Sequence, residues 1–114
     1  MKFSIERGVL MKAVAQAQSV VERRNTIPIL ANVLIEAEGF DVSLRATDLD
    51  IEVVDKVPAQ VERAGATTVP AVLLNEIVRK LPDGALVALS DQDTPGRLTI
   101  WAGRATFTLS TLPT

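Results

Sequence analysis

The chain has 114 residues, 47% of them hydrophobic and 23% charged, which indicates a single globular domain and argues against intrinsic disorder. It contains no cysteine, which excludes disulfides and thiolate metal sites and fits a cytoplasmic protein. The absence of histidine removes the commonest general base and the commonest metal ligand, which argues against an enzyme, and we expect no cofactor. A net charge of −2 argues against binding nucleic acid by overall charge, so a DNA-binding role would need the basic residues gathered on one face.

The first half of the chain predicts a strand, a helix and three strands. Residues 2–6 (KFSIE) alternate apolar and polar side chains, which is typical of a half-buried strand. From residue 7 to residue 21 apolar residues recur at steps of three and four, which predicts an amphipathic helix. Three strands joined by short polar turns should follow as antiparallel neighbours. They are expected at residues 29–39, 40–48 and 49–58.

The second half predicts the same order after a linker at residues 59–65 (AQVERAG). A short strand over 66–70 ends at Pro70, which is favourable at a helix start because its missing N–H is not needed there. The helix is expected over 71–81, stopped by the PDG sequence that follows. Its apolar side should carry Leu73, Leu74, Ile77, Val78 and Leu81. Three further strands are expected at residues 85–90, 97–102 and 105–111.

The repeated order predicts an α+β fold built from two βαβββ halves, at about residues 1–58 and 59–114. Each helix has one apolar face, and each of about eight strands has one buried face. We therefore expect the two helices to lie side by side on one face of an antiparallel sheet.

Two acidic segments could in principle hold a metal ion. Asp48, Asp50 and Glu52 fall on one side of a strand, where three carboxylates could bind magnesium as in a nuclease. The simpler interpretation is a solvated outer face, because no histidine or lysine partner accompanies them. Asp91 and Asp93 lie in a Pro-Gly turn that lacks the ligand series of a calcium loop, so this segment predicts a hairpin tip.

Basic residues cluster near the ends of both predicted helices. Arg23 and Arg24 end the first helix, where cations commonly complement the helix dipole. The alternative is a phosphate contact, for which Lys12 would extend the basic face of the first helix, and Arg79 and Lys80 that of the second. Glutamates in both helices dilute this charge, so any attraction to DNA should be weak.

Five blocks of sequence carry a family resemblance along the whole chain: MKFSIERGVLMKAV, TIPILANVLIEA, TDLDIEV, GATTVPAVLLNEIVRKLP and GRATFTLSTLP. Together they resemble the first domain of the bacterial DNA polymerase III β subunit, the replicative sliding clamp. The resemblance implies the DNA-clamp fold and a chain of three such domains. Two chains would join head to tail as a homodimer ring around double-stranded DNA, independent of its sequence, and tether the polymerase without catalysing a reaction.

The resemblance also implies which residues approach DNA. Arg24 matches the loop arginine of the family that lies near the duplex, whereas Arg23 is a neighbour without a firm family role. Arg79 matches a basic position at the end of the second helix, and Lys80 adds a charge. Val72 stands near the start of that helix where a family member has a basic residue, so a DNA contact is doubtful there.

The last strand resembles the edge that joins the third domain of the partner chain. Phe107 and Leu109 would present apolar side chains at this dimer interface, with Arg104 as a polar neighbour and with Leu73 and Ile77 contributed by the second helix. The alternative places Phe107 and Leu109 in the core of this domain, which their alternation with polar residues supports equally well.

The resemblance further implies that residues 1–114 form a single domain, the first of three. The pocket for peptides of the polymerase and the clamp loader would lie between the other two domains, outside this chain. Two alternatives remain open: a protein-interaction scaffold with a clamp-like fold that does not contact DNA, and the magnesium-dependent nuclease considered above.

Overall fold

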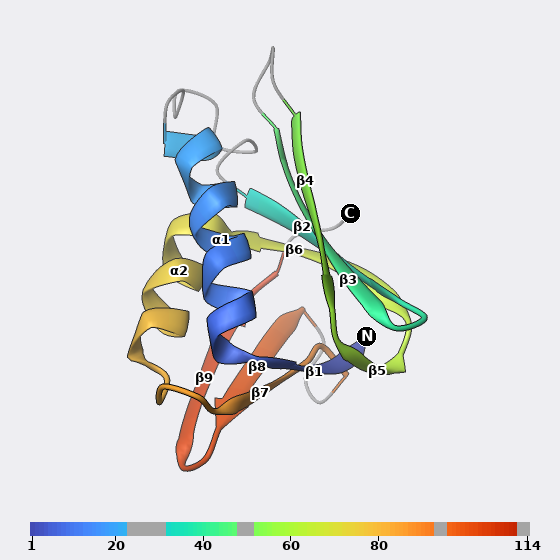
Figure 1. Cartoon of the computed structure of the whole chain (residues 1–114), viewed down its shortest axis with the longest axis vertical. Coiled ribbons are helices and arrows are strands. Elements are labelled where there is room, and N and C mark those ends of the chain that lie inside the picture. The colour runs from blue at the N-terminus through green and yellow to red at the C-terminus, as the bar shows by residue number, and fades with distance from the viewer. Residues whose placement is uncertain (23–31, 48–51, 93–95, 112–114) are drawn as a thin grey trace.

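The computed structural model describes residues 1–22, 32–47, 52–92 and 96–111, with two helices and nine strands in these ranges (Figure 1). The elements are β1 (Lys2–Glu6), α1 (Arg7–Glu22), β2 (Asn32–Glu38), β3 (Asp41–Thr47), β4 (Glu52–Pro58), β5 (Gln60–Arg63), β6 (Gly65–Pro70), α2 (Ala71–Lys80), β7 (Leu86–Ser90), β8 (Arg97–Ala102) and β9 (Ala105–Ser110). Both predicted helices and the predicted α+β class are confirmed.

The strands form two antiparallel sheets. One has the order β5-β1-β7-β8-β9 and the other the order β4-β3-β2-β6. Strand β1 therefore leaves the first half of the chain to pair with β7, and β6 leaves the second half to pair with β2. Each half donates the strand directly before its helix to the sheet of the other half, which ties the two halves together. The origin of the halves by duplication stays a prediction.

The core lies between the helices and the two sheets. The helices pack against each other, α1 also contacts β3 and β4, and α2 contacts β6 (Figure 1). Helix α1 buries Leu10, Ala13, Val14 and Ala17, whose spacing of three and four residues keeps them on one face. The strands bury alternate residues, as in β2, where Val33, Ile35 and Ala37 point inward. Burial of these apolar side chains is the main stabilising contribution to the fold.

Three expectations need correction. The segment predicted as a linker contains strand β5, whose backbone pairs with β1 so that Val61 lies opposite Phe3. The single sheet is in fact two sheets, because β1 and β6 exchange places between the halves. Leu73 was expected on the apolar side of the second helix but is 42% exposed, because the buried face of α2 runs along Leu74, Ile77 and Val78.

Candidate nucleic-acid interface

The end of α2 places two of the predicted DNA-facing cations together. Arg79 and Lys80 are exposed in its last turn, where positive charge is favourable beside the carbonyl end of the helix dipole. Both line a groove of about 450 Å³, which Glu76 also lines. The groove therefore has two cations and one carboxylate among its described residues, an arrangement that can attract a phosphate weakly.

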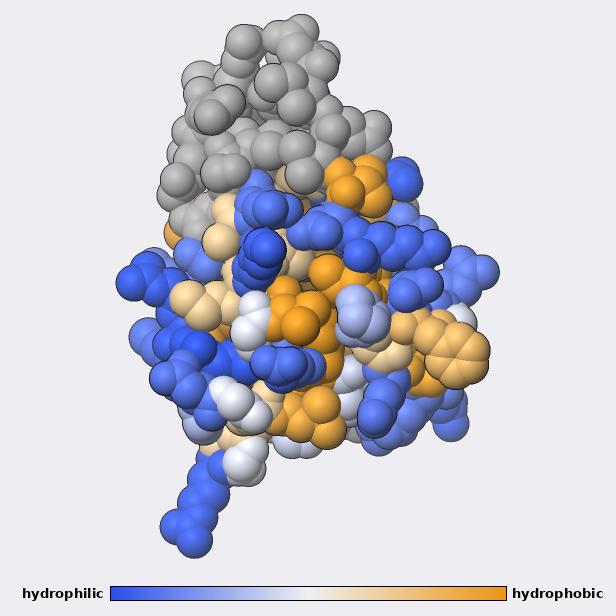
Figure 2. All heavy atoms as spheres, viewed as in Figure 1, coloured by the Kyte–Doolittle hydropathy of each residue, from blue (hydrophilic) through white to orange (hydrophobic). Residues whose placement is uncertain are grey.

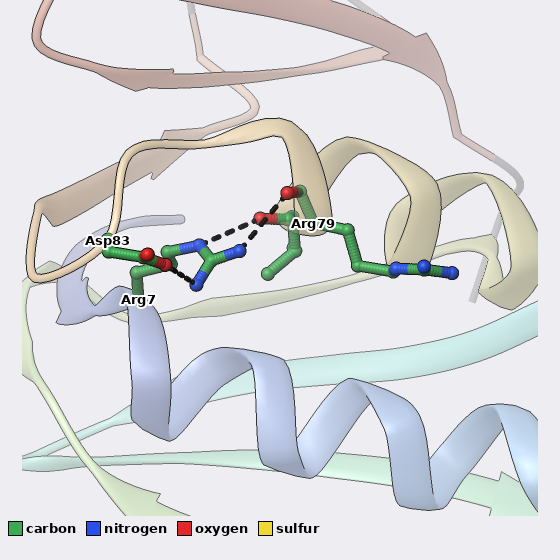
Figure 3. A network of polar contacts seen from close by, with 4 residues as sticks. Arg7, Arg79 and Asp83 are labelled. Carbon is green, nitrogen blue, oxygen red and sulfur yellow. Dashed lines mark hydrogen bonds and ion pairs between the residues drawn. The ribbon is translucent and has the colours of Figure 1, made fainter.

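A network of polar contacts holds this end of α2 against the start of α1 (Figure 3). The side chain of Arg7 donates from Nε to the carbonyl oxygen of Val78 at 3.2 Å and from Nη2 to that of Arg79 at 3.1 Å. Its Nη1 forms an ion pair with the carboxylate of Asp83. The Arg7 backbone N–H also donates to the carbonyl of Ala85 at 2.9 Å. One residue thus joins α1, the end of α2 and the loop leading to β7.

Lys12 lies at a different groove from Arg79 and Lys80. It is exposed on α1 and lines a groove of about 360 Å³ between α1 and β4, together with Asp55 and the apolar side chains of Val9 and Val57. Figure 2 shows hydrophobic residues exposed near the middle of this face, surrounded by hydrophilic ones. The structure therefore brings together two of the five predicted cations and separates Lys12 from them.

Several predicted site residues cannot be placed. Arg23, Arg24, Asp48 and Asp50 lie outside the described residues, and for Glu52 the structure describes the backbone of β4 but not the side chain. Within the described ranges no group of three or more histidine, cysteine, aspartate or glutamate side chains is arranged to hold a metal ion. No helix in the same ranges is long and apolar enough to cross a membrane.

The residues predicted at the dimer interface divide into core and surface. Leu109 is 3% exposed and Ile77 is 7% exposed, so both side chains belong to the core of this domain. Phe107 is half-buried, and Leu73 and Arg104 are exposed. Strand β9 lies at an edge of the five-stranded sheet and pairs on one side with β8. Of the five, only Phe107, Leu73 and Arg104 have surface that a partner could contact.

Sequence reasoning missed the roles of two charged residues. Asp91, predicted only as part of a hairpin tip, pairs through Oδ1 with the amino group of Met1 at 2.8 Å, and its backbone N–H donates to the carbonyl of Met1. Arg7 received no role because its partners lie more than 70 residues away along the chain. The signal that could have indicated this contact is Pro82. It lies four residues after Val78 and has no N–H, so it cannot donate the helical hydrogen bond to the carbonyl of Val78, which therefore needs another donor.

Comparison with known proteins identifies the family. A family model described as DNA polymerase III beta subunit, N-terminal domain, matches residues 1–114. The chain belongs to this family. Its similarity extends to the beta sliding clamp of Caulobacter vibrioides, with 57% identity over 113 residues, and to that of Pseudomonas aeruginosa, with 42% identity over 114 residues. Each alignment covers 99% of this chain and 30% of the relative.

Solved structures of the beta subunit family share the fold. The Caulobacter crescentus pol III beta structure superimposes with a TM-score of 0.93 at 57% identity, covering 99% of this chain and 31% of that one. The DNA polymerase III subunit beta from Pseudomonas aeruginosa gives a TM-score of 0.90 at 42% identity, covering 99% and 30%. The chain thus spans about a third of the length of these relatives and matches their N-terminal domain.

Proposed function

We propose that this chain is the first of three domains of a replicative sliding clamp, which encircles duplex DNA and tethers a DNA polymerase for processive synthesis. The observation that carries the proposal is the match of all 114 residues to the N-terminal domain of the DNA polymerase III beta subunit. A superposition at a TM-score of 0.93 on a structure from that family supports it.

The weak and mixed charge of the domain suits this role. A closed ring is retained on DNA by topology, so it needs no strong electrostatic attraction, which would also slow its movement along the duplex. The net charge of −2 and the presence of Glu76 beside Arg79 and Lys80 fit a surface that contacts phosphates only weakly. The domain would act as a non-catalytic processivity factor.

We assign the DNA-facing role to cations on and beside the two helices. Arg24 is the principal contact, Arg79 and Lys80 form a second one at the end of α2, and Lys12 contributes from the other groove. Arg23 is a weaker candidate because the family resemblance gives it no firm role. All five would contact phosphates, so the binding would not depend on the DNA sequence.

The second chain of the ring would join head to tail along β9. We assign this contact to Phe107, Leu73 and Arg104, with Leu109 and Ile77 supporting them from the core beneath. Polymerase and clamp loader would bind through the remaining two domains. The location would be the cytoplasm, where bacterial chromosomal DNA is replicated.

The DNA contact can be tested on the full-length chain by fluorescence anisotropy with a short labelled duplex at low ionic strength. Arg24→Ala should weaken binding equally on unrelated sequences and lower the slope of log affinity against log salt by about 0.9 for a lost phosphate contact. Arg97→Ala, at an exposed position on β8, is the matched control for loss of one positive charge.

Three results would redirect the proposal. Tight binding to one sequence would contradict it. Wild-type affinity and loading in both Arg24→Ala and Lys12→Ala would favour the scaffold that does not contact DNA. Cleavage of DNA on addition of magnesium would favour the nuclease.

A further inference from the structure

The last turn of α2 lacks the donors that a continuing helix would supply. In an α-helix each carbonyl accepts a hydrogen bond from the N–H four residues later. For Val78 that residue is Pro82, which has no N–H, and for Arg79 it is Asp83, beyond the end of the helix at Lys80. The backbone partly compensates, since the N–H of Leu81 reaches the carbonyl of Val78 at 3.2 Å.

Arg7 supplies the missing donors from a different part of the chain. Its guanidinium is a planar fork, and two of its nitrogens donate to the two carbonyls of Val78 and Arg79 at 3.2 and 3.1 Å (Figure 3). The third nitrogen pairs with Asp83 in the loop after the helix. The cation also lies at the negative end of the α2 dipole, which adds a favourable electrostatic term.

We infer that Arg7 is a positioning residue that fixes the direction in which Arg79 and Lys80 leave α2, and so sets the phosphate contact of this helix. The inference rests on the proposed function. One of the bonds from Arg7 ends on the carbonyl of Arg79 itself, so the backbone that carries this side chain is held directly. The Arg79 side chain points away from Arg7 in Figure 3, which leaves its own guanidinium available.

Arg7 is poorly placed to contact DNA itself. Its side chain is only 13% exposed, and all three guanidinium nitrogens are engaged in the contacts described above. Without Arg7, the carbonyl of Val78 would keep the bond from Leu81, the carbonyl of Arg79 would lose the donor that Arg7 supplies, and the last turn of α2 would fray more readily. Arg79 and Lys80 would then be distributed over several orientations, and the ordering needed to meet a phosphate would reduce the affinity.

The test measures the affinity of the full-length chain for a short duplex at low ionic strength. Arg7→Gln removes the cation, whereas Arg7→Lys keeps it but cannot reproduce the fork. If Arg7 positions Arg79 and Lys80, both variants should lose at least about two-fold in DNA affinity, a size typical of coupling through a neighbouring residue. The double substitution Arg79→Ala with Lys80→Ala should lower the salt slope by up to about 1.8, for two phosphates. Adding Arg7→Gln to that background should cause no further loss.

Two controls separate positioning from general effects. Arg97→Gln makes the same chemical change at an exposed position on β8 and should bind like wild type. Hydrogen exchange at the amide of Leu81 should accelerate in Arg7→Gln and Arg7→Lys, because the last turn opens more often. If Arg7→Gln is unfolded at the assay temperature, Arg7→Lys carries the test, since it retains the charge and the aliphatic stem.

Three outcomes would overturn the inference. Wild-type affinity in Arg7→Lys would show that only the charge matters. Additive losses from Arg7→Gln and the Arg79/Lys80 substitutions would show that Arg7 acts independently of them. Wild-type affinity in the Arg79/Lys80 double variant would show that the end of α2 does not contact DNA. The separate Arg24→Ala measurement would then decide whether the proposed function survives.

Discussion

The side chain of Leu109 allows a quantitative test of whether this residue belongs to the core of the domain or to the partner interface. It lies on the inner face of the edge strand β9, opposite Leu98 on β8, and it is 3% exposed while Leu98 is fully buried. Leu109→Ala removes about three methylene-sized groups, which at about 0.8 kcal/mol each gives about 2.4 kcal/mol before any cavity is counted. Incomplete collapse of the cavity brings the expected loss of unfolding free energy to about 3 kcal/mol.

Urea unfolding of the 114-residue chain, followed by the fluorescence of Trp101 on the neighbouring strand β8, measures this loss. The slope of the unfolding free energy against urea, about 1–3 kcal/mol/M for a small protein, should not change, so the midpoint should fall by about 1–3 M. Thr108→Ala, at the adjacent exposed position of β9, is the matched control and should stay within about 0.5 kcal/mol of wild type.

A loss in Leu109→Ala no larger than in the Thr108→Ala control would refute the assignment of Leu109 to the core. If self-association of the full-length chain weakened at the same time, the side chain would belong to the partner interface instead.

Other predictions follow from single contacts. Asp91→Asn should lower the unfolding free energy by about 1–2 kcal/mol, because it weakens a partly buried, charge-assisted bond to the amino group of Met1, and a thermal melt at fixed pH would check it. Gly103→Ala should lower the unfolding free energy by about 1 kcal/mol in the same measurement, because Gly103 has a φ of +58° in the β8–β9 turn. Stability equal to wild type would mean that the turn adapts to alanine. Leu73→Asp should leave the 114-residue chain folded, because the side chain is 42% exposed. It should shift the full-length chain toward monomers in sedimentation, because it would place a charge in the proposed interface. An unchanged dimer would exclude Leu73 from the interface.

Local patterns predicted the helices and most strands well. The apolar spacing of residues 7–21 describes one face of α1, and the alternation in β2 and β3 gives their buried faces. Strand β5 was not predicted, because its sequence QVER has a single apolar residue. It is an edge strand held mainly by its backbone pairing with β1. Such pairing leaves little trace in the pattern of side chains.

Long-range pairings were not predictable in this way. The exchange of β1 and β6 between the sheets depends on contacts across the whole chain, which periodicity within one segment does not report. The contact of Arg7 with the end of α2 is of the same kind, although Pro82 marks the carbonyl that needs a donor. Among the candidate interface residues, alternation alone could not separate Phe107 from Leu109, because both face the same side of β9 and differ only in depth.

The central claim, that the domain belongs to a ring closed around DNA, is tested most directly by the topology of binding. The full-length chain would be loaded by its clamp loader on nicked circular duplex and passed through a sizing column at high salt, before and after a single cut linearises the circle. A ring predicts retention on the circle and complete release from the linear DNA, since salt screens phosphate contacts but cannot open the ring. Equal retention on both forms, or release from both, would contradict the account.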